Sequence, residues 1–196
     1  MNQITNDYYT RHAAQFATET FNLSDSMQQL YNTFMHHLNG NCILDLGCGS
    51  GRDSVHFANN GYNVVSLEKN ASLAKIASEN GARNVVCRDI FDYNPSQKFD
   101  GIWACASLLH IDLLSLSLIF TKCACMLNDG GVLYCSFKYG GFEGVRNGRY
   151  FVDMTESKLK SIIDQVGCLD LIEMRVSEDV RSDTRQRWLN AYLCRR

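Results

Sequence analysis

The chain has 196 residues, of which 45% are hydrophobic and 20% are charged, and this profile is typical of one soluble globular domain rather than a disordered or fibrous protein. Lys and Arg number 19 against 21 Asp and Glu, a balance that argues against a protein whose main task is to grip a nucleic-acid backbone. No segment approaches the ~18 apolar residues of a membrane span, and the polar N-terminus has no signal-peptide pattern, so we expect a cytoplasmic protein.

The hydrophobic pattern changes period after Asn39-Gly40. Before this point apolar residues recur at helical spacing, and after it short apolar runs alternate with helical segments. The expected helices cover residues 7–20, 24–38 (with Ser24 or Asp25 as N-cap), 52–60, 70–80, 112–127 and 155–166. The expected strands cover residues 42–46, 62–67, 84–87, 99–104, 131–137, 169–177 and 187–193.

Strands that alternate with helices predict a parallel sheet with right-handed crossovers. The last two strands have no helix between them and predict an antiparallel hairpin added to that sheet. We therefore expect an α/β, Rossmann-like fold with a mostly parallel seven-stranded sheet, helices on both faces and a C-terminal antiparallel hairpin. The glycine-rich segment 139–148 is expected to be a loop, either a mobile cover or a plain connector.

The nine cysteines form no Cys-x-x-Cys pair and lie mostly in apolar runs. This usage predicts buried reduced thiols in a reducing compartment rather than a disulfide framework. Cys123 and Cys125 are expected to fill the core, and the His36-His37 pair lacks partner ligands, so we expect no metal site.

A glycine-rich turn follows the first expected strand directly and opens a helix. The segment 44–53 reads LDLGCGSGRD, with Gly47, Gly49 and Gly51 in alternation. Such a turn lets a ligand approach the backbone and the free N–H groups of a helix N-terminus. Arg52 occupies the sixth position, where a dinucleotide site would have glycine. The alternative is an ordinary tight turn.

Two carboxylates follow the next two strands at the same edge of the expected sheet. Glu68 ends the second strand, where an acid can accept the hydroxyls of a ribose. Asp89 follows the third strand, beside Ile90 and Phe91, where an acid and apolar neighbours can hold a purine. Each acid alone fits a solvated loop, but together with the glycine turn they predict an adenosine site.

With these motifs the chain resembles the class I S-adenosylmethionine-dependent methyltransferases over nearly its whole length. The resemblance rests on segment 43–51, Glu68, Asp89 and the strand 99–103, and the continuation after Gly51 is most similar to small bacterial tellurite-resistance and thiopurine-type methyltransferases. It implies one methyltransferase domain over residues 1–196, with an N-terminal helical lid (1–40), a cofactor-binding half (41–138) and a substrate side (139–196).

The resemblance also implies roles for individual residues at the cofactor. The residues expected to bind S-adenosyl-L-methionine, and S-adenosyl-L-homocysteine as product, are Tyr9, Asp45, Gly47, Cys48, Gly49, Gly51, Arg52, Glu68, Lys69, Asp89, Ile90, Cys105 and Ala106. Among them, Asp45 would orient the glycine loop and face the methionine amino group, and Tyr9 would close over the cofactor as a lid. Arg52 would meet the methionine carboxylate or, alternatively, pair with Asp53 on the helix surface.

Four residues are the candidates for the acceptor side. His110 follows the fourth strand and could take a proton near neutral pH, or it could be a packed core histidine. Tyr139 lies in the glycine-rich loop between Lys138 and Tyr150, which also carries Arg146 and Arg149. Arg181 and Arg185 lie between the last two strands and could bind an oxyanion, or form a solvated hairpin tip.

We expect methyl transfer by in-line displacement to a small-molecule acceptor, with an anionic acceptor as an extension from the two arginines. No DNA partner is expected, because the Asn/Asp/Ser-Pro-Pro-aromatic turn of DNA amino-methyltransferases is missing and the only proline is Pro95. No membrane partner is expected, and the protein would be a monomer or a homodimer. The alternatives are an RNA or protein methyltransferase and a non-catalytic S-adenosylmethionine-binding module.

Overall fold

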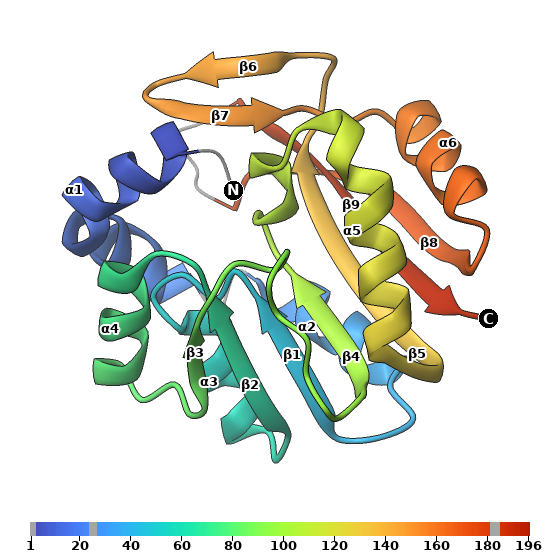
Figure 1. The fold of residues 1–196 in the computed structure, drawn as a ribbon, viewed down its shortest axis with the longest axis horizontal. Helices are drawn as coiled ribbons and strands as arrows, with labels where there is room; N and C mark the ends of the chain where they lie inside the picture. Colours follow the sequence, from blue (N-terminus) through green and yellow to red (C-terminus); the bar gives the residue numbers. More distant parts are fainter. Residues whose placement is uncertain (1–2, 24–26, 181–184) are drawn as a thin grey trace.

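The computed structural model describes residues 3–23, 27–180 and 185–196. Within them a seven-stranded sheet has the order β3-β2-β1-β4-β5-β9-β8 (Figure 1). Its strands are β1 (Cys42–Leu46), β2 (Asn63–Glu68), β3 (Val85–Cys87), β4 (Phe99–Ala104), β5 (Leu127–Lys138), β8 (Leu169–Glu178) and β9 (Arg187–Arg195). β1 to β5 pair in parallel, and β9 runs antiparallel to both β5 and β8. The predicted mostly parallel sheet with a C-terminal antiparallel hairpin is confirmed.

The described α-helices match the helices predicted from the sequence except at their ends, and two short 3-10 helices, η1 (Phe21–Leu23) and η3 (Leu108–His110), were not predicted. The α-helices are α1 (Gln3–Thr20), α2 (Gln28–His36), α3 (Arg52–Asn59), α4 (Ala71–Glu79), α5 (Leu113–Met126) and α6 (Glu156–Val166). The predicted N-caps Ser24 and Asp25 lie outside the described residues. α1 begins earlier than predicted because tertiary contacts hold its polar first turn, where Thr5 accepts a hydrogen bond from the backbone of Tyr150 at 2.8 Å.

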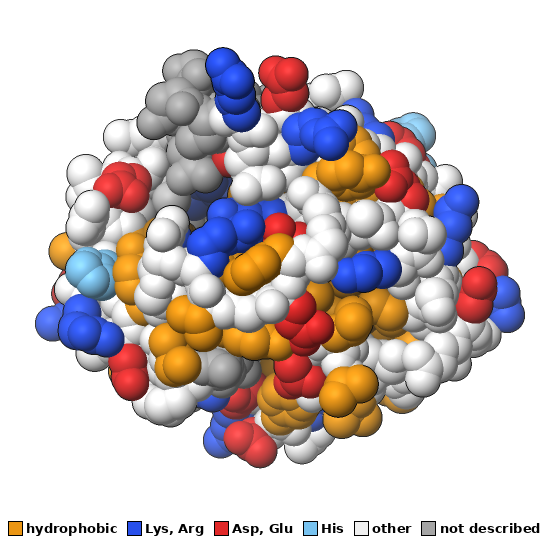
Figure 2. Space-filling model, turned by 90° about the horizontal axis from the view of Figure 1, so that it is seen from above, with side chains coloured by type: hydrophobic (Ala, Val, Ile, Leu, Met, Phe, Trp, Pro, Cys, Tyr) orange, Lys and Arg blue, Asp and Glu red, His pale blue; other side chains and the backbone are white. Residues whose placement is uncertain are grey.

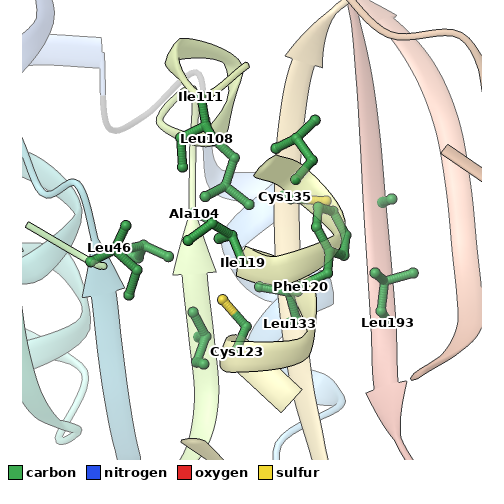
Figure 3. Close-up of a cluster of buried hydrophobic side chains, with 14 of the residues drawn as sticks. Leu46, Ala104, Leu108, Ile111, Ile119, Phe120, Cys123, Leu133, Cys135 and Leu193 are labelled. Carbon is green, nitrogen blue, oxygen red and sulfur yellow. The ribbon is translucent and has the colours of Figure 1, made fainter. Parts of the chain in front are cut away.

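Alternate side chains of the central strands point to opposite faces of the sheet, as the pleat requires. On β4, Ile102 and Ala104 join the larger hydrophobic cluster, which packs against α5 and α6, and part of this cluster is shown in Figure 3. Trp103, between them in sequence, joins a second cluster with side chains of α2 and α3. Each of these three side chains is fully buried, so the sheet is covered on both faces at its centre, as the continuous apolar strands predicted.

The prediction of a glycine-rich loop over residues 139–148 is partly wrong, because part of this segment forms a β-hairpin. β6 (Glu143–Arg146) and β7 (Arg149–Val152) pair in a separate two-stranded sheet above the carboxyl ends of the main strands (Figure 1). Asn147 and Gly148 connect them with φ values of 51° and 73°. Positive φ at both central residues is typical of a type I′ turn, for which Asn-Gly is the preferred sequence.

The helices of the described residues include none that is long and apolar enough to cross a membrane. On the face seen in Figure 2, Lys and Arg side chains lie interspersed with Asp and Glu side chains. This face therefore has no continuous basic stripe among its described residues.

Candidate active site

A cavity opens at the carboxyl ends of β1, β2, β4 and β5, between α1 on one side and the β6–β7 and β8–β9 hairpins on the other. Its wall draws on both halves of the chain, including the following residues: Tyr9, Phe16, Gly47, Cys48, Gly49, Arg52, Asp53, Glu68, Cys105, Ala106, Ser107, His110, Ser136, Lys138, Arg149, Phe151, Trp188 and Asn190. In open α/β sheets this edge is where ligands bind.

The glycine turn forms one wall of the cavity. Gly47, Gly49 and Gly51 have φ values of 75°, 57° and 86°, the left-handed region that favours glycine. A Cβ on Gly47 would lie 2.5 Å from the Cβ of Ser107, so a larger residue would collide with the turn after β4. The turn is held to β2, because Gly47 N and Cys48 N donate to the carbonyl of Leu67 at 2.8 and 3.0 Å.

Glu68 joins this turn to the end of β2. Its carboxylate accepts a hydrogen bond from Gly49 N at 2.9 Å and from Asn70 N at 2.8 Å. Burial raises the pKa of Glu68, while these backbone donors lower it. A buried acid that touches the glycine turn and faces the cavity is suited to accept hydrogen bonds from the hydroxyls of a bound sugar.

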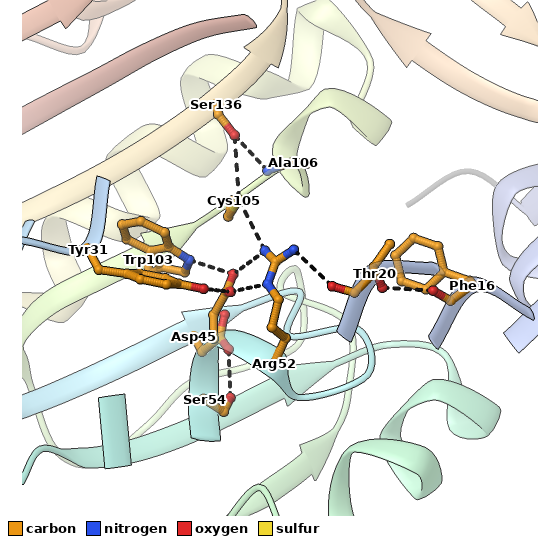
Figure 4. Close-up of polar contacts among 11 residues, drawn as sticks. Phe16, Thr20, Tyr31, Asp45, Arg52, Ser54, Trp103, Cys105, Ala106 and Ser136 are labelled. Carbon is orange, nitrogen blue, oxygen red and sulfur yellow. Dashed lines mark hydrogen bonds and ion pairs between the residues drawn. The ribbon is translucent and has the colours of Figure 1, made fainter. Parts of the chain in front are cut away.

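Asp53 lies in the cavity wall at the centre of a buried polar cluster, whose members Tyr31, Arg52 and Trp103 are labelled in Figure 4. Its carboxylate accepts hydrogen bonds from Trp103 Nε1 at 2.8 Å, from the hydroxyl of Tyr31, and from the Arg52 guanidinium at 2.5 and 2.9 Å. Burial opposes ionisation of Asp53, but Arg52 and these donors outweigh it and lower the pKa of Asp53. Arg52 therefore pairs with Asp53, as one alternative predicted, but inside the protein rather than on the helix surface.

Asp45 lies behind the glycine turn, and its carboxylate faces α3 rather than the cavity. Oδ2 accepts a hydrogen bond from the hydroxyl of Ser54 at 2.6 Å, and Ser54 in turn accepts one from Ser66 at 2.7 Å. Burial, aided by the negative charge of Asp53, raises the pKa of Asp45 to about 8. The position of Asp45 suits the predicted role of orienting the loop through α3, whereas direct contact with a ligand would need a bridging group.

His110 lies in the cavity wall at the end of η3 and is 3% exposed. Its Nδ1 lies 2.7 Å from the carbonyl oxygen of Tyr150, which can only accept, so Nδ1 carries the proton. Nε2 is therefore unprotonated and accepts a hydrogen bond from the hydroxyl of Tyr9 at 3.1 Å. Burial lowers the pKa of His110 to about 3, so the ring is neutral at physiological pH.

Helix α1 covers the cavity and is attached to both sides of it. Asn70, the N-cap of α4, donates its side-chain amide to the carbonyl of Asn6 at 3.0 Å and to the hydroxyl of Thr10 at 2.8 Å. Further along the helix, Phe16 lies over Gly49, where an added Cβ would be 3.3 Å from Cε1 of the ring. The predicted lid residue Tyr9 belongs to this helix and lies in the cavity wall.

The opposite wall carries polar groups from β5 and β9. Asn190, inside an apolar strand, accepts a hydrogen bond from the hydroxyl of Tyr134 at 2.8 Å and donates to Ser177 Oγ at 3.0 Å. Ser136 Oγ accepts a hydrogen bond from Ala106 N at 2.8 Å and so fixes the turn after β4. Burial raises the pKa of the neighbouring Cys105 thiol to about 12, so this cysteine is not a nucleophile at neutral pH.

Several residues predicted for the site lie away from the cavity. Lys69 and Asp89 form an ion pair at 2.7 Å, and the hydroxyl of Tyr139 donates to Glu156 at 2.9 Å under the guanidinium of Arg187. Arg185 is exposed. Those absent from the cavity wall are Asp45, Gly51, Lys69, Asp89, Ile90, Tyr139 and Arg185. Arg181 lies outside the described residues.

Sequence reasoning missed other residues of the wall, notably Asp53 and Ser107, and it named Arg149 only as one residue of the glycine-rich loop. Asp53 resembles an ordinary first-turn acid, and nothing in its sequence neighbourhood shows that Tyr31 and Trp103 will converge on it. Arg149 had a usable signal, because the Asn147-Gly148 dipeptide that places it is a strong hairpin indicator. No cluster of His, Cys, Asp and Glu suitable for a metal ion occurs in the part of the chain that the structure describes.

The strand order, the glycine turn after β1 and the acid at the end of β2 together define the fold of the class I S-adenosylmethionine-dependent methyltransferases. Residues 44–135 match the family model described as a methyltransferase domain. The resemblance stated from the sequence motifs is thereby confirmed.

Similarity to individual proteins extends these findings. Over 104 residues the chain is 30% identical to the ubiquinone biosynthesis O-methyltransferase of Bradyrhizobium sp. (strain ORS 278), a match covering 50% of this chain and 40% of that protein. The matched region thus spans less than half of that relative. Burkholderia thailandensis 1,6-didemethyltoxoflavin-N1-methyltransferase, crystallised with 1,6-didemethyltoxoflavin and S-adenosylhomocysteine, superposes with a TM-score of 0.80 at 16% identity, over 98% of this chain and 88% of that one. TehB from Haemophilus influenzae superposes with a TM-score of 0.66 at 17% identity, over 88% of this chain and 62% of that one.

Proposed function

We propose that the protein transfers a methyl group from S-adenosyl-L-methionine to a small-molecule acceptor and releases S-adenosyl-L-homocysteine. One observation carries the proposal: the glycine turn and Glu68, at neighbouring strand ends, line the same cavity as His110 and the side chains of β5, β7 and β9. A cofactor half and an acceptor half thus share one enclosed space. The matched methyltransferase domain and the ligands named for similar structures support this function.

The residues of the cavity fit this cofactor. Two glycines of the turn, Gly47 and Gly49, lie in the wall and let a ligand approach the backbone, and the buried hydroxyl of Ser107 in the wall has no hydrogen-bond partner among the described residues. Such an orphan hydroxyl is the kind of group that a bound ligand satisfies. When bound, S-adenosylmethionine supplies a methyl group on a positively charged sulfur, already activated for displacement.

The chain's own task is then mainly to hold two reactants in line and to exclude water. In the proposed arrangement the glycine turn holds the methionine moiety, Glu68 accepts the ribose hydroxyls, and Cys105 and Ala106 flank the sulfur. Arg52, whose positive charge is balanced by Asp53, offers its remaining N–H groups to the methionine carboxylate. In the proposed division of the domain, residues 1–40 form the lid, and α1 lies over the cofactor.

The proposed adenine contacts with Asp89 and Ile90 lie beyond the cavity wall, next to Lys69. Since Lys69 and Asp89 are paired at 2.7 Å, the ion pair would have to open or rotate for the carboxylate to accept an exocyclic amine. This part of the proposal requires a rearrangement of two side chains that are 29% and 15% exposed.

On the acceptor side, His110 is the residue proposed to hold the acceptor by its Nε2 lone pair. The predicted role of taking a proton near neutral pH does not fit, because burial lowers the pKa of His110 to about 3 and makes the ring a weak base. That lone pair is engaged by Tyr9 in the closed cavity, so an acceptor would replace the Tyr9 hydroxyl or reach His110 through it. The enclosure by α1 and the β6–β7 hairpin favours a small acceptor over a macromolecule. A cytoplasmic monomer or homodimer remains our expectation for the protein as a whole.

Calorimetric titration with S-adenosylhomocysteine tests the cofactor site. Glu68→Gln removes the charge that receives the ribose and should weaken binding by about tenfold or more, the order expected for a hydrogen bond to a charged group. Glu79→Gln, an exposed acid on α4, is the matched control and should bind normally. A wild-type protein that binds neither S-adenosylhomocysteine nor S-adenosylmethionine would contradict the proposal.

The acceptor is then sought with methyl-labelled cofactor over a panel of phenols, thiols, amines and carboxylates. The proposal expects labelled small-molecule product with at least one class. Cofactor binding together with labelling of RNA or protein alone would favour the alternative macromolecular substrate instead.

A further inference from the structure

Arg149 is the first residue after the Asn147-Gly148 turn, and its side chain reaches from β7 into the cavity wall. Its guanidinium carbon lies 4.7 Å from the ring centre of Tyr8 and 5.2 Å from that of Phe151. These two rings, from α1 and β7, hold the guanidinium in place by cation–π contact.

This cation has no carboxylate partner among the described ion pairs. Arg146, opposite it in the hairpin register, donates to both oxygens of Asp153 at 2.8 and 3.2 Å. Arg149 makes only a long hydrogen bond of 3.4 Å to the hydroxyl of Tyr9, and its Nε is buried without any partner. Arg149 as a whole is half-buried, but its buried Nε–H lacks an acceptor among the described residues, so this part of the wall is suited to an anionic ligand.

A second cation lies against the same aromatic ring. Lys138 ends β5, lines the cavity, and places its Nζ 4.4 Å from the ring centre of Phe151. Arg146 of β6 is a third cation against this ring, at 4.9 Å, but it is paired with Asp153. Arg149 and Lys138 line the same part of the cavity.

The acids in the cavity wall have hydrogen-bond or ion-pair partners of their own or lie at its outer edge. Asp53 is taken up by Arg52, and Glu68 by two backbone N–H groups. Asp179 accepts a hydrogen bond from Trp188 Nε1 at 2.9 Å. Glu178 is exposed at the outer end of β8.

Resting on the proposed function, we infer that Arg149, assisted by Lys138, binds an oxyanion carried by the methyl acceptor. The walls beside it are aromatic, from Phe151, Tyr9 and Trp188. The acceptor class is therefore a small aromatic compound that bears a carboxylate or a phenolate. The anion site lies on the β6–β7 hairpin, whereas the sequence pointed to Arg181 and Arg185.

Four simple aromatic probes test this site on the protein saturated with S-adenosylhomocysteine. Benzoate and 4-nitrophenolate represent the two sources of an oxyanion, benzamide is the neutral analogue, and benzylamine is the cationic one. By calorimetry or ligand-observed NMR, at least one oxyanion should bind about tenfold more tightly than benzamide, and benzylamine should bind most weakly.

Variants assign the preference to Arg149. Arg149→Gln should lose the preference for the oxyanion while its affinity for benzamide and for S-adenosylhomocysteine stays unchanged. Arg149→Lys keeps the charge but not the planar guanidinium, so it should keep part of the preference for the oxyanion. Arg83→Gln removes an exposed arginine outside the cavity wall and should behave as the wild type.

The outcomes separate the two proposals. If S-adenosylhomocysteine does not bind, the proposed function is wrong, and the probes are titrated into the protein alone, where the same oxyanion preference is expected. If the cofactor product binds but all four probes bind alike, or benzylamine binds best, the inference about Arg149 is wrong. An oxyanion preference that survives in both Arg149 variants would also overturn it.

Discussion

The hydroxyl of Tyr9 lies 3.1 Å from Nε2 of His110, although 101 positions separate the two residues in the chain. This hydrogen bond joins helix α1 to the turn that follows β4, across the mouth of the cavity. Because Nδ1 of His110 donates to the carbonyl of Tyr150, one imidazole links α1, η3 and β7. The ring therefore combines a structural role in the closed cavity with its proposed role toward the acceptor.

The buried imidazole should make the protein sensitive to acid. The pKa of His110 falls from its usual 6.5 to about 3, chiefly because burial disfavours the charged ring. Below pH 6.5 the unfolded chain binds a proton that the folded protein does not, so stability falls as the pH falls, by up to about 1.4 kcal/mol for each pH unit. In His110→Gln the urea-unfolding free energy should decline less steeply between pH 6.5 and 4.

Exposed His36 provides the comparison for this measurement. His36→Gln should leave the acid dependence as it is in the wild type. A His110→Gln profile that is parallel to the wild type would show that His110 is not held neutral by the fold.

Asp45 should lower the stability of the protein as the pH rises, the opposite of the effect of His110. Burial and the charge of Asp53 raise the pKa of Asp45 from its usual 3.8 to about 8. Its contribution to stability is present below the unfolded-state pKa and is lost as the pH rises through the folded-state pKa, because the unfolded chain ionises first. Asp45→Asn cannot ionise, so its stability relative to the wild type should improve steadily from pH 5 to pH 8.

Thermal unfolding of the two proteins at a series of pH values checks this expectation. Exposed Asp92→Asn is the control and should show no such trend. A constant difference between Asp45→Asn and the wild type at all pH values would mean that Asp45 is ionised in the folded protein.

The conformation of the Asn147-Gly148 turn can be tested by adding one methyl group, in Gly148→Ala. Gly148 has a φ of 73°, and a Cβ there would lie 3.0 Å from Cδ2 of Tyr8. Gly148→Ala should cost about 1–2 kcal/mol from the left-handed backbone alone, and it should also displace the ring under Arg149. Gly141→Ala, where a Cβ would meet no atom within 4 Å, should change stability by less than about 0.5 kcal/mol. Equal urea midpoints for both variants would contradict the described turn.

The strands whose ends line the cavity were predictable because local sequence patterns mark where each strand begins and ends. β1 and β4 have their predicted ends, and the other central strands differ by a few residues, since apolar runs buried on both faces stop at glycine or polar residues. β5 begins at Leu127, earlier than predicted. Leu127 pairs with Phe99 of β4, and a register shift between Phe99 and Gly101 accommodates the residues between Leu127 and Val132, which include two glycines.

The acceptor side was less predictable because its chemistry depends on contacts between distant segments. Arg52 and Asp53 are neighbours in sequence, but only the convergence of Tyr31 and Trp103 from other elements turns them into a buried pair. The isolated hairpin was missed because a two-stranded sheet carries little apolar pattern, and its turn dipeptide stood among other glycines. The cofactor loop, by contrast, is a local motif that one segment encodes.

The anchoring of α1 by Thr5, Asn6 and Tyr9 also has a consequence for how the chain matures. Their partners are Tyr150, Asn70 and His110, all far downstream. On a ribosome this helix emerges before any of its docking sites exist, so it must wait until residue 150 has been made. A helix that is synthesised before its partners is thus among the last elements to settle, and closing the cavity is a late event in folding.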